Sequence, residues 1–384
     1  MKKLFIITLI LVVSNLVAKP KIIKSLRLEQ HENGWYEDQA EKWKKEVNKN
    51  PENPDNWYNY LRALRYVTNR NYSGFDNMDK IKFLQNKVKE SQKYIGNSWQ
   101  FYHLKYIFNK KDNKQLLKKI HKMKPDNSSI NLDLLTMAEK ALDREKRKKW
   151  SEYVYKIGIF HDNLLEMGYN LLQSIEPNGI LFVNGDNDTF PLWILQDVFD
   201  LRNDVSIINF GLAHSKSYLS KLIKEENLKF KNFEKWFDPG LNSELFLKDI
   251  LDNNPERVVY FSHTCQQKFI KYFERNLYNT GLVSRYSEER LDNVALLKRN
   301  FNKRFHLDYL TSQWSSKSAP YSVLAINNNY FAGIFILIEH YITGEQLGKA
   351  RYWINFGKRV IVKNSRQKKA ITGYLTSLEK KLDE

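Results

Sequence analysis

The sequence predicts a protein of the α/β class joined to all-α regions, in which a small parallel α/β module of three or four strands is flanked by helical regions. Three observations favour this fold class. Apolar residues recur at helical spacing through the first 176 residues, short apolar runs alternate with helical patterns over residues 177–287, and helical spacing returns after that. We therefore expect four segments: a signal peptide over residues 1–18, a helical region over 19–176, the α/β module over 177–287 and a C-terminal helical region over 288–384.

The composition is that of a globular protein with a basic surface. Apolar residues make up 42% of the 384 residues and aromatic residues 14%, which is enough to fill hydrophobic cores. The formal charge is +18, from 62 basic and 44 acidic residues, a balance that also occurs in proteins that bind nucleic acids. The basic residues are spread along the chain, however, and most are Lys mixed with Asn. This pattern favours a solvated basic surface and argues against a nucleic-acid partner.

The first residues have the pattern of a secretory signal peptide. Lys2 and Lys3 precede an apolar run over residues 4–13, and small and polar residues follow as far as Ala18, where we expect cleavage. Leu16 is bulky for its place two residues before the cut, so an uncleaved N-terminal anchor is the alternative. The apolar run is short for a bilayer crossing, which needs roughly 20 residues, and no later segment is long enough. We expect an exported protein, periplasmic or secreted, with no transmembrane span in the mature chain.

The single cysteine limits how the chain is stabilised. Cys265 has no partner in the sequence, so an intrachain disulfide cannot form and the cores must hold the fold. We predict that Cys265 is a small buried apolar residue. A reactive free thiol is the alternative.

The helical region contains a candidate repeat. A Pro-rich break, NPENPD over residues 50–55, precedes the aromatic-rich stretch NWYNYLRALRY, and Asp55 is predicted to cap the helix that follows. A similar stretch, SWQFYHLKYIF, begins at Ser98, so that Trp57 and Trp99 lie 42 residues apart. The break and the first helix resemble the start of a tetratricopeptide-type helix pair, although that family repeats about every 34 residues. The alternative is an irregular helical bundle with an aromatic core.

The α/β module begins with a strand, a helix and a second strand. GILFV over residues 179–183 and VSIINF over 205–210 are rich in strand formers, and the apolar residues between them lie on one helical face. Such a βαβ unit is parallel, because its crossover connection is right-handed. RVVYF over residues 257–261 is a third strand, and LVSRY over 282–286 is a candidate fourth.

The stretch NGDNDT, which follows the first strand, is the candidate ligand site. Its Asn-Gly pair is a hairpin signal, but Pro191 cannot donate to a ladder and the residues after it have helical spacing. In the βαβ interpretation this stretch leaves the carboxyl end of a strand, where open α/β sheets bind ligands. Asp186 and Asp188 offer the oxygen ligands that Ca²⁺ or Mg²⁺ prefers. The alternative is structural: Asp188 or Thr189 caps the helix and Asp186 stabilises the turn.

The neighbouring loops extend this candidate site. Residues 184–204 form an acidic island, with five Asp and one Arg in a basic protein. If the sheet is parallel, loops that contain His214 and His263 open at the same edge, and their convergence with the two Asp would form a catalytic or metal site. Each His by itself reads as an ordinary polar loop residue. The ligand-binding candidates are Asn184, Gly185, Asp186, Asp188, Thr189, His214 and His263, with Asp186 and Asp188 as the metal ligands.

Three stretches of the second half carry a resemblance to a known family. NGDNDTFPLWILQDVFDLRNDVSIIN, NNPERVVYFS and GLVSRY resemble the soluble tail of bacterial multi-spanning membrane proteins akin to protein O-mannosyltransferases. The chain as a whole looks most like exported soluble relatives that combine this tail with a helical-repeat front. The membrane-embedded part that would transfer the sugar is missing here. The resemblance therefore implies the fold, with Gly185, Asp186 and Arg202 as pattern residues, and it implies no catalytic role.

Two functions follow from these observations. The first is an exported, noncatalytic binding or scaffold protein of the cell envelope, linked to glycan or glycoprotein processing, whose partner is an envelope protein or a glycan. The alternative is a metal-assisted enzyme that acts on glycans or phosphorylated sugars, in which Asp186 and Asp188 hold the cation and His214 or His263 serves as the base. A binder of anionic surfaces is a third interpretation that rests on the net charge alone.

Overall fold

The computed structural model describes residues 19–26, 29, 31–69, 78–108, 114–237, 240–314, 319–361 and 367–382. The expected signal peptide lies outside the described residues. The chain divides into two compact units, of which the first is Met1–Lys24 with His31–Met123 and the second is Ser25–Gln30 with Lys124–Glu384. The expected helical region over 19–176 is thus shared between the two units.

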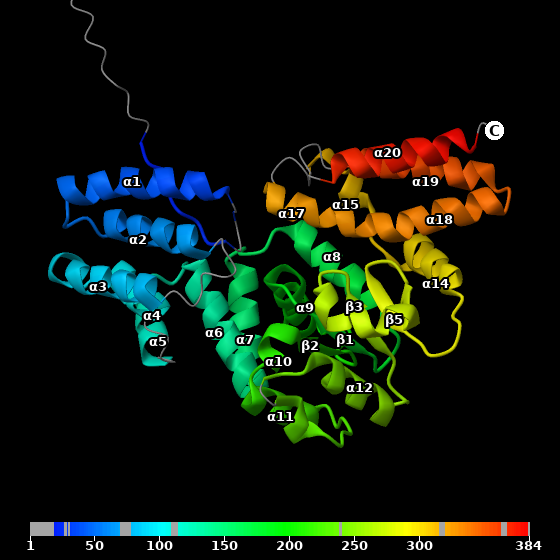
Figure 1. The fold of residues 1–384 in the computed structure, drawn as a ribbon, viewed down its shortest axis with the longest axis horizontal. Helices are drawn as coiled ribbons and strands as arrows, with labels where there is room; N and C mark the ends of the chain where they lie inside the picture. Colours follow the sequence, from blue (N-terminus) through cyan, green and yellow to red (C-terminus); the bar gives the residue numbers. More distant parts are fainter. Residues whose placement is uncertain are drawn as a thin grey trace, which may run out of the picture. The chain divides into compact units, whose positions relative to one another are not determined.

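The first unit is a stack of helices. They are α1 (Asn33–Lys49), α2 (Pro54–Asn69), α3 (Met78–Ile95), α4 (Trp99–Phe108) and α5 (Lys114–Met123). Helix α1 packs on α2, α2 packs on α3 and α4, and α4 packs on α5 (Figure 1). Aromatic residues fill the space between them, among them Tyr36, Trp43 and Trp57, which are buried. This packing of successive helices agrees with the helical-repeat interpretation.

The Pro-rich break between α1 and α2 is held by side chains of α2. The Asn56 amide donates to two carbonyl oxygens at the end of α1, at 2.9 and 3.0 Å, and the Trp57 indole donates to the Pro51 carbonyl at 2.9 Å. The predicted cap at Asp55 is wrong. The helix begins at Pro54, whose missing N–H costs nothing in a first turn, and Asn53 Oδ1 accepts the Asp55 amide at 3.0 Å. The Asp55 carboxylate instead accepts from Gln100 of α4.

The second unit is built around a five-stranded sheet in the order β2-β1-β3-β5-β4. The strands are β1 (Ile180–Val183), β2 (Ser206–Asn209), β3 (Val259–Ser262), β4 (Leu277–Asn279) and β5 (Val283–Tyr286). Strand β1 pairs in parallel with both β2 and β3, as the crossover rule predicts. The segment after β1 is helix α9 (Asp186–Phe199), so the rejection of the hairpin is confirmed.

The prediction of a wholly parallel sheet is correct only for three strands. Strand β5 occupies the candidate fourth position but runs antiparallel to β3, and β4, which the sequence analysis missed, runs antiparallel to β5. Only residues 280–282 connect β4 to β5, and a connection this short can make a hairpin but not a crossover. Gly281 has φ +131°, a conformation that other residues rarely adopt, and it turns the chain there. The sheet is therefore mixed.

Each face of the sheet is covered by helices. Leu181 and Val183 belong to one apolar core, which includes residues of α8, α9, α18, α19 and α20, whereas Ile180 and Phe182 belong to a second core with α11 and α12. Figure 1 shows these helices around the strands. The alternation follows from the period of two along a strand. Because both faces are buried, β1 reads as a continuous apolar run rather than an alternating one.

Helices on both sides of the strands in sequence complete this unit. Those before and between the strands are α6 (Ser128–Ala141), α7 (Arg144–Lys156), α8 (Asp162–Gln173), α10 (Phe210–Ala213), α11 (Lys216–Glu225), η2 (Phe233–Phe237), α12 (Ser243–Asn253), α13 (Gln267–Ile270) and η3 (Lys271–Asn276). After β5 come α14 (Asn293–Arg299), η4 (Asn300–Arg304), α15 (Asp308–Thr311), α17 (Tyr321–Ile326), η5 (Asn327–Tyr330), α18 (Phe331–Thr343), α19 (Leu347–Val360) and α20 (Lys368–Lys380). In the described part of the chain, no helix combines the length and the apolar character that a bilayer crossing requires.

Candidate functional site

The acidic stretch after β1 forms the first turn of helix α9 rather than a free loop. Gly185 is the N-cap residue and has no side chain to cap the helix, and Asp186 and Asp188 lie in the first turn. Asp188 reaches back, so that its Oδ2 accepts the Asn184 amide at 3.3 Å. A Cβ atom at position 185 would lie 3.1 Å from Asp188 Oδ1, so the carboxylate lies close against a residue that has no side chain. Asp188 therefore closes the strand-to-helix turn. The structural alternative placed a helix cap at Asp188 or Thr189, and this prediction is wrong, because the N-cap residue is Gly185 and no side-chain cap bond is formed there.

The ends of the three parallel strands meet at one edge, where their side chains bond to one another. After β3, the Thr264 hydroxyl donates to the Asp188 carboxylate. At the end of β2, the Asn209 amide donates to Thr189 Oγ1 at 2.8 Å, and Thr189 in turn donates to the Gly185 carbonyl at 2.6 Å. The candidate residues of this edge are thus brought together, but their polar groups hold the strand ends and the first turn of α9. Ligand binding by them stays a prediction.

Burial sets the protonation of Asp188. Its side chain is 1% exposed, and the loss of water raises the pKa of the carboxyl to about 6, against the lowering effect of the Thr264 hydroxyl and the neighbouring amides. The same burial raises the pKa of the Cys265 thiol well above its usual value, with the nearby Asp188 carboxyl adding to the shift. Cys265 donates to the Phe182 carbonyl at 3.3 Å. Both groups have the properties of interior residues rather than of an exposed acid and a reactive thiolate.

The two histidines occupy separate surroundings. His214 is exposed, and its Nδ1 lies 2.7 Å from the Phe210 carbonyl of its own turn. His263 is half-buried beside β4, with Nε2 3.5 Å from the Asn279 amide nitrogen, and burial lowers the pKa of its imidazole. Among the residues that the structure describes, no group of three or more His, Cys, Asp or Glu side chains is arranged to hold a metal ion. The arrangement gives no support to the predicted Ca²⁺ or Mg²⁺ site at Asp186 and Asp188.

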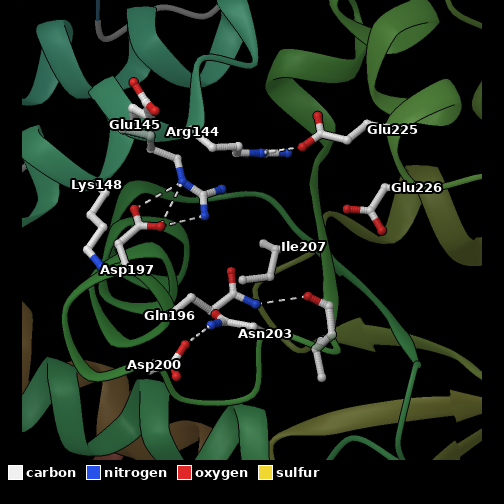
Figure 2. Close-up of a pocket in the computed structure, with 12 residues that line it drawn as sticks. Arg144, Glu145, Lys148, Gln196, Asp197, Asp200, Asn203, Ile207, Glu225 and Glu226 are labelled. Carbon is white, nitrogen blue, oxygen red and sulfur yellow. Dashed lines mark hydrogen bonds and ion pairs between the residues drawn. The ribbon is translucent and has the colours of Figure 1, made fainter.

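A polar pocket of about 420 Å³ lies elsewhere on the second unit, at the amino end of β2 (Figure 2). Its lining comes from α7, from the end of α9, from the start of β2 and from the end of α11. The lining residues are Arg144, Glu145, Arg147, Lys148, Gln196, Asp197, Asp200, Asn203, Val205, Ile207, Glu225 and Glu226. The acidic island was the sequence signal for this pocket, because Asp197 and Asp200 belong to it. From the sequence alone, these acidic residues were expected at the opposite edge of the sheet.

A network of ion pairs around the buried residues Glu139 and Arg147 forms one wall of the pocket. Arg147 bonds Asp197 through two nitrogens, at 3.0 and 2.7 Å, and bonds Glu139 at 2.9 Å. Arg144 bonds the same Glu139 and also Glu225, at 2.6 Å. The Tyr218 hydroxyl of α11 donates to Glu139 at 2.8 Å, and the nearby carboxylate raises the pKa of this buried phenol further. The network therefore joins α6 and α7 to α9 and α11.

Comparisons with known proteins bear on this region. The family described as TMEM260-associated domain 2 matches residues 164–229, from α8 to just beyond α11. The match includes the longest of the three stretches that resemble the O-mannosyltransferase-related proteins, and it supports that resemblance over these residues. A search of curated proteins finds no match.

Among solved structures, the crystal structure of yeast Tom70 is similar at 11% identity with a TM-score of 0.27, over 91% of this chain and 60% of that one. This chain thus spans less than two thirds of the length of that protein. Similarity at this level carries no argument about fold or function.

Proposed function

We propose that this chain is an exported, noncatalytic binding or scaffold protein of the cell envelope, linked to glycan or glycoprotein processing. The observation that carries the proposal is the state of Asp188. Its carboxyl is buried and accepts hydrogen bonds from the Asn184 amide and the Thr264 hydroxyl. A general acid or a metal ligand must reach a substrate or a cation. Both hydrogen bonds go to Oδ2, which holds two strand ends together, and Oδ1, which has no partner among the described residues, is buried away from the surface.

The other parts of the proposal rest on sequence. Export follows from the basic and apolar start of the chain. The link to glycan processing follows from the resemblance to O-mannosyltransferase-related proteins and from the family match over residues 164–229. Partner binding is supported by the polar pocket, whose ion pairs hold its wall in a defined arrangement.

The alternative, a metal-assisted enzyme acting on glycans or phosphorylated sugars, is tested first by titration calorimetry with Ca²⁺, Mg²⁺ and Mn²⁺. Three proteins are compared: the wild type, Asp186→Ala and Asp162→Ala. Asp162 is the matched control, because it lies in the first turn of another helix of the same unit. We expect the same absence of heat in all three. Binding that Asp186→Ala abolishes and Asp162→Ala preserves would instead establish the metal site and reverse the proposal.

The binding role itself is tested by crosslinking in the cell envelope of cells that produce the chain. We expect a defined protein or glycoprotein to be recovered with the tagged chain at a constant ratio, with wild type and Asp186→Ala alike. A cation-dependent turnover of glycans or sugar phosphates by the purified chain, lost in Asp186→Ala, would contradict the noncatalytic proposal.

A further inference from the structure

The pocket at the amino end of β2 carries an excess of negative charge. Its lining holds five carboxylates, from two Asp and three Glu, and three basic side chains. Glu139 pairs with Arg147 and Arg257 pairs with Glu226. These two residues outside the lining add one charge of each sign, so the excess of two carboxylates remains. The chain as a whole has a net charge of +18. The net charge of the pocket lining is therefore opposite in sign to the net charge of the whole protein.

Two of the three basic side chains of the lining are already engaged in ion pairs. Arg147 is held by Asp197 and Glu139, and Arg144 is held by Glu139 and Glu225. In the described part of the chain, Lys148 makes no ion pair, and Figure 2 shows it at one side of the pocket. Two arginines whose hydrogen bonds already go to carboxylates of the protein have little left to offer an anionic ligand. The pocket is thus poorly suited to a phosphate or a carboxylate.

Gln196 directs a hydrogen-bond acceptor into the pocket. Its side chain is 7% exposed, and its Nε2 donates to two backbone carbonyls, Arg202 at 3.0 Å and Val205 at 2.9 Å. A carbonyl oxygen can only accept, so the amide nitrogen has to lie on that side, and the orientation of the amide group is determined. The Oε1 atom then faces the pocket (Figure 2), and no hydrogen bond to it comes from the described residues. This acceptor opens onto the pocket and has no hydrogen-bond partner among the described residues, so it suits a ligand that donates.

The remaining lining favours a donor on an apolar stem. Val205 and Ile207 provide apolar surface next to Gln196, while Asp200, with an amide hydrogen bond from Asn203 as its partner, and Glu226 supply carboxylate oxygens. A metal ion does not fit, because the described residues include no group of three or more suitable ligands. A neutral sugar would leave the charge excess uncompensated. An ammonium group on an aliphatic stem matches the charge, the acceptor and the apolar surface together.

We propose that this pocket binds a primary alkylammonium group, carried either by a lysine side chain of a partner protein or by a polyamine. The inference rests on the proposed binding role and names its ligand class. Figure 2 shows the carboxylates of Glu225 and Glu226 at one side of the pocket and that of Asp200 at another, with Gln196 between them.

The test is titration calorimetry of the full chain with spermidine and with Nα-acetyl-lysine amide. Nα-acetyl-norleucine amide serves as the uncharged analogue, and glucose and inorganic phosphate represent the other ligand classes. We expect at least one amine to bind in a one-to-one complex that weakens with added salt, and no binding of the three other compounds. Spermidine binding more tightly indicates a free polyamine as the source, and the lysine amide binding more tightly indicates a protein side chain.

Variants locate the binding. Asp200→Asn keeps the size of an exposed side chain and removes one carboxylate, so we expect the amine Kd to rise about five- to tenfold, as for the loss of one near charge in a solvated site. Asp252→Asn is the matched control, with the same change of charge on an exposed position of α12 outside the lining. The double variant Asp200→Asn with Glu145→Gln should bind more weakly than the single one. Both changed positions are at the surface, so circular dichroism should show an intact fold.

Several results would overturn the assignment. They are no detectable binding of either amine at millimolar concentration, equally tight binding of the norleucine analogue, binding of glucose or phosphate instead, or an equal loss of amine affinity in Asp252→Asn. These assays use the purified chain and need no envelope partner. Silent amines together with a recovered envelope partner would overturn only this inference and leave the proposed function standing.

Discussion

Replacing Asp188 by Asn should change how the stability of the second unit depends on pH. The carboxyl is 1% exposed and burial raises its pKa to about 6, from 3.8 for a solvated Asp. Between these two values the folded state holds a proton that the unfolded chain has released. The contribution of this group to stability is therefore complete below pH 3.8 and is lost as the pH rises to about 6.

The size of the effect follows from the pKa difference. Each pKa unit corresponds to about 1.4 kcal/mol, so the buried carboxylate costs the folded state about 3 kcal/mol above pH 6 relative to acid conditions. Asp188→Asn does not titrate, and its amide oxygen can still accept from the Thr264 hydroxyl. We therefore expect the variant to gain about 3 kcal/mol in free energy of unfolding over the wild type as the pH rises through this window.

The single cysteine provides an assay specific to this unit. Cys265 is buried close to Asp188, so its labelling after equilibration in urea reports the unfolded fraction of the sheet region. A pyridyl disulfide is a suitable reagent, because it reacts with thiols in acid. The difference between the two proteins is then followed across the pH series. Asp204→Asn is the control with the opposite sign, because the Arg202 guanidinium lowers the pKa of Asp204, whose contribution is lost as the pH falls.

Two outcomes would refute the reasoning about Asp188. A difference in unfolding free energy that does not change with pH would mean that Asp188 does not titrate in this window. A difference that changes in the opposite direction would mean that the hydrogen bonds from Thr264 and the amides outweigh burial, which would lower the pKa below 3.8.

Three further predictions concern other parts of the second unit. Arg147→Ala should lower the free energy of unfolding by about 3 to 5 kcal/mol in urea denaturation. The substitution removes the guanidinium that pairs with Glu139 and Asp197 and leaves both carboxylates buried. A loss below about 1 kcal/mol would show that water hydrates these carboxylates instead. Cys265 should react with a thiol reagent far more slowly in the folded chain than in urea, because it is buried and the pKa of its thiol is raised; equal rates would favour the reactive-thiol alternative. Gly281→Ala should lower the free energy of unfolding by about 1 to 3 kcal/mol in thermal or urea unfolding. The reason is that φ at this position is +131° and a Cβ atom would lie 2.9 Å from a phenylalanine ring. An unchanged stability would contradict the turn described between β4 and β5.

The strands show which part of the sheet could be predicted. The runs that became β1, β2 and β3 are short, apolar and bounded by turn residues, and the helix after β1 enforces a parallel pairing with β2. The direction of β5 could not be predicted from the sequence, because it depends on β4, the strand that precedes it. That strand has three half-buried residues and no periodicity to identify it. Its pairing is decided by the short turn at Gly281 and by the space beside β3.

The candidate site shows a similar division. The acidic island over residues 184–204 was visible in the sequence, and so was the meeting of the strand ends after β1 and β3. The sequence could not show that Asp188 turns back toward Asn184 and Thr264, because that depends on which groups lie within hydrogen-bonding distance.

By itself the sequence determined the periodic features of this protein: its helices, its apolar strands, the parallel pairing of β1 with its neighbours and the position of the strand ends at one edge. These depend on the spacing of apolar residues and on the handedness of short connections, which are local properties. Only the tertiary structure decided where the polar groups act. Arg144 and Glu225 lie 81 residues apart and bond in the wall of the pocket, because the packing of α7 against α9 and of α11 beside β2 brings them there. A side chain's partners are set by the packing of whole elements, and no local pattern contains them.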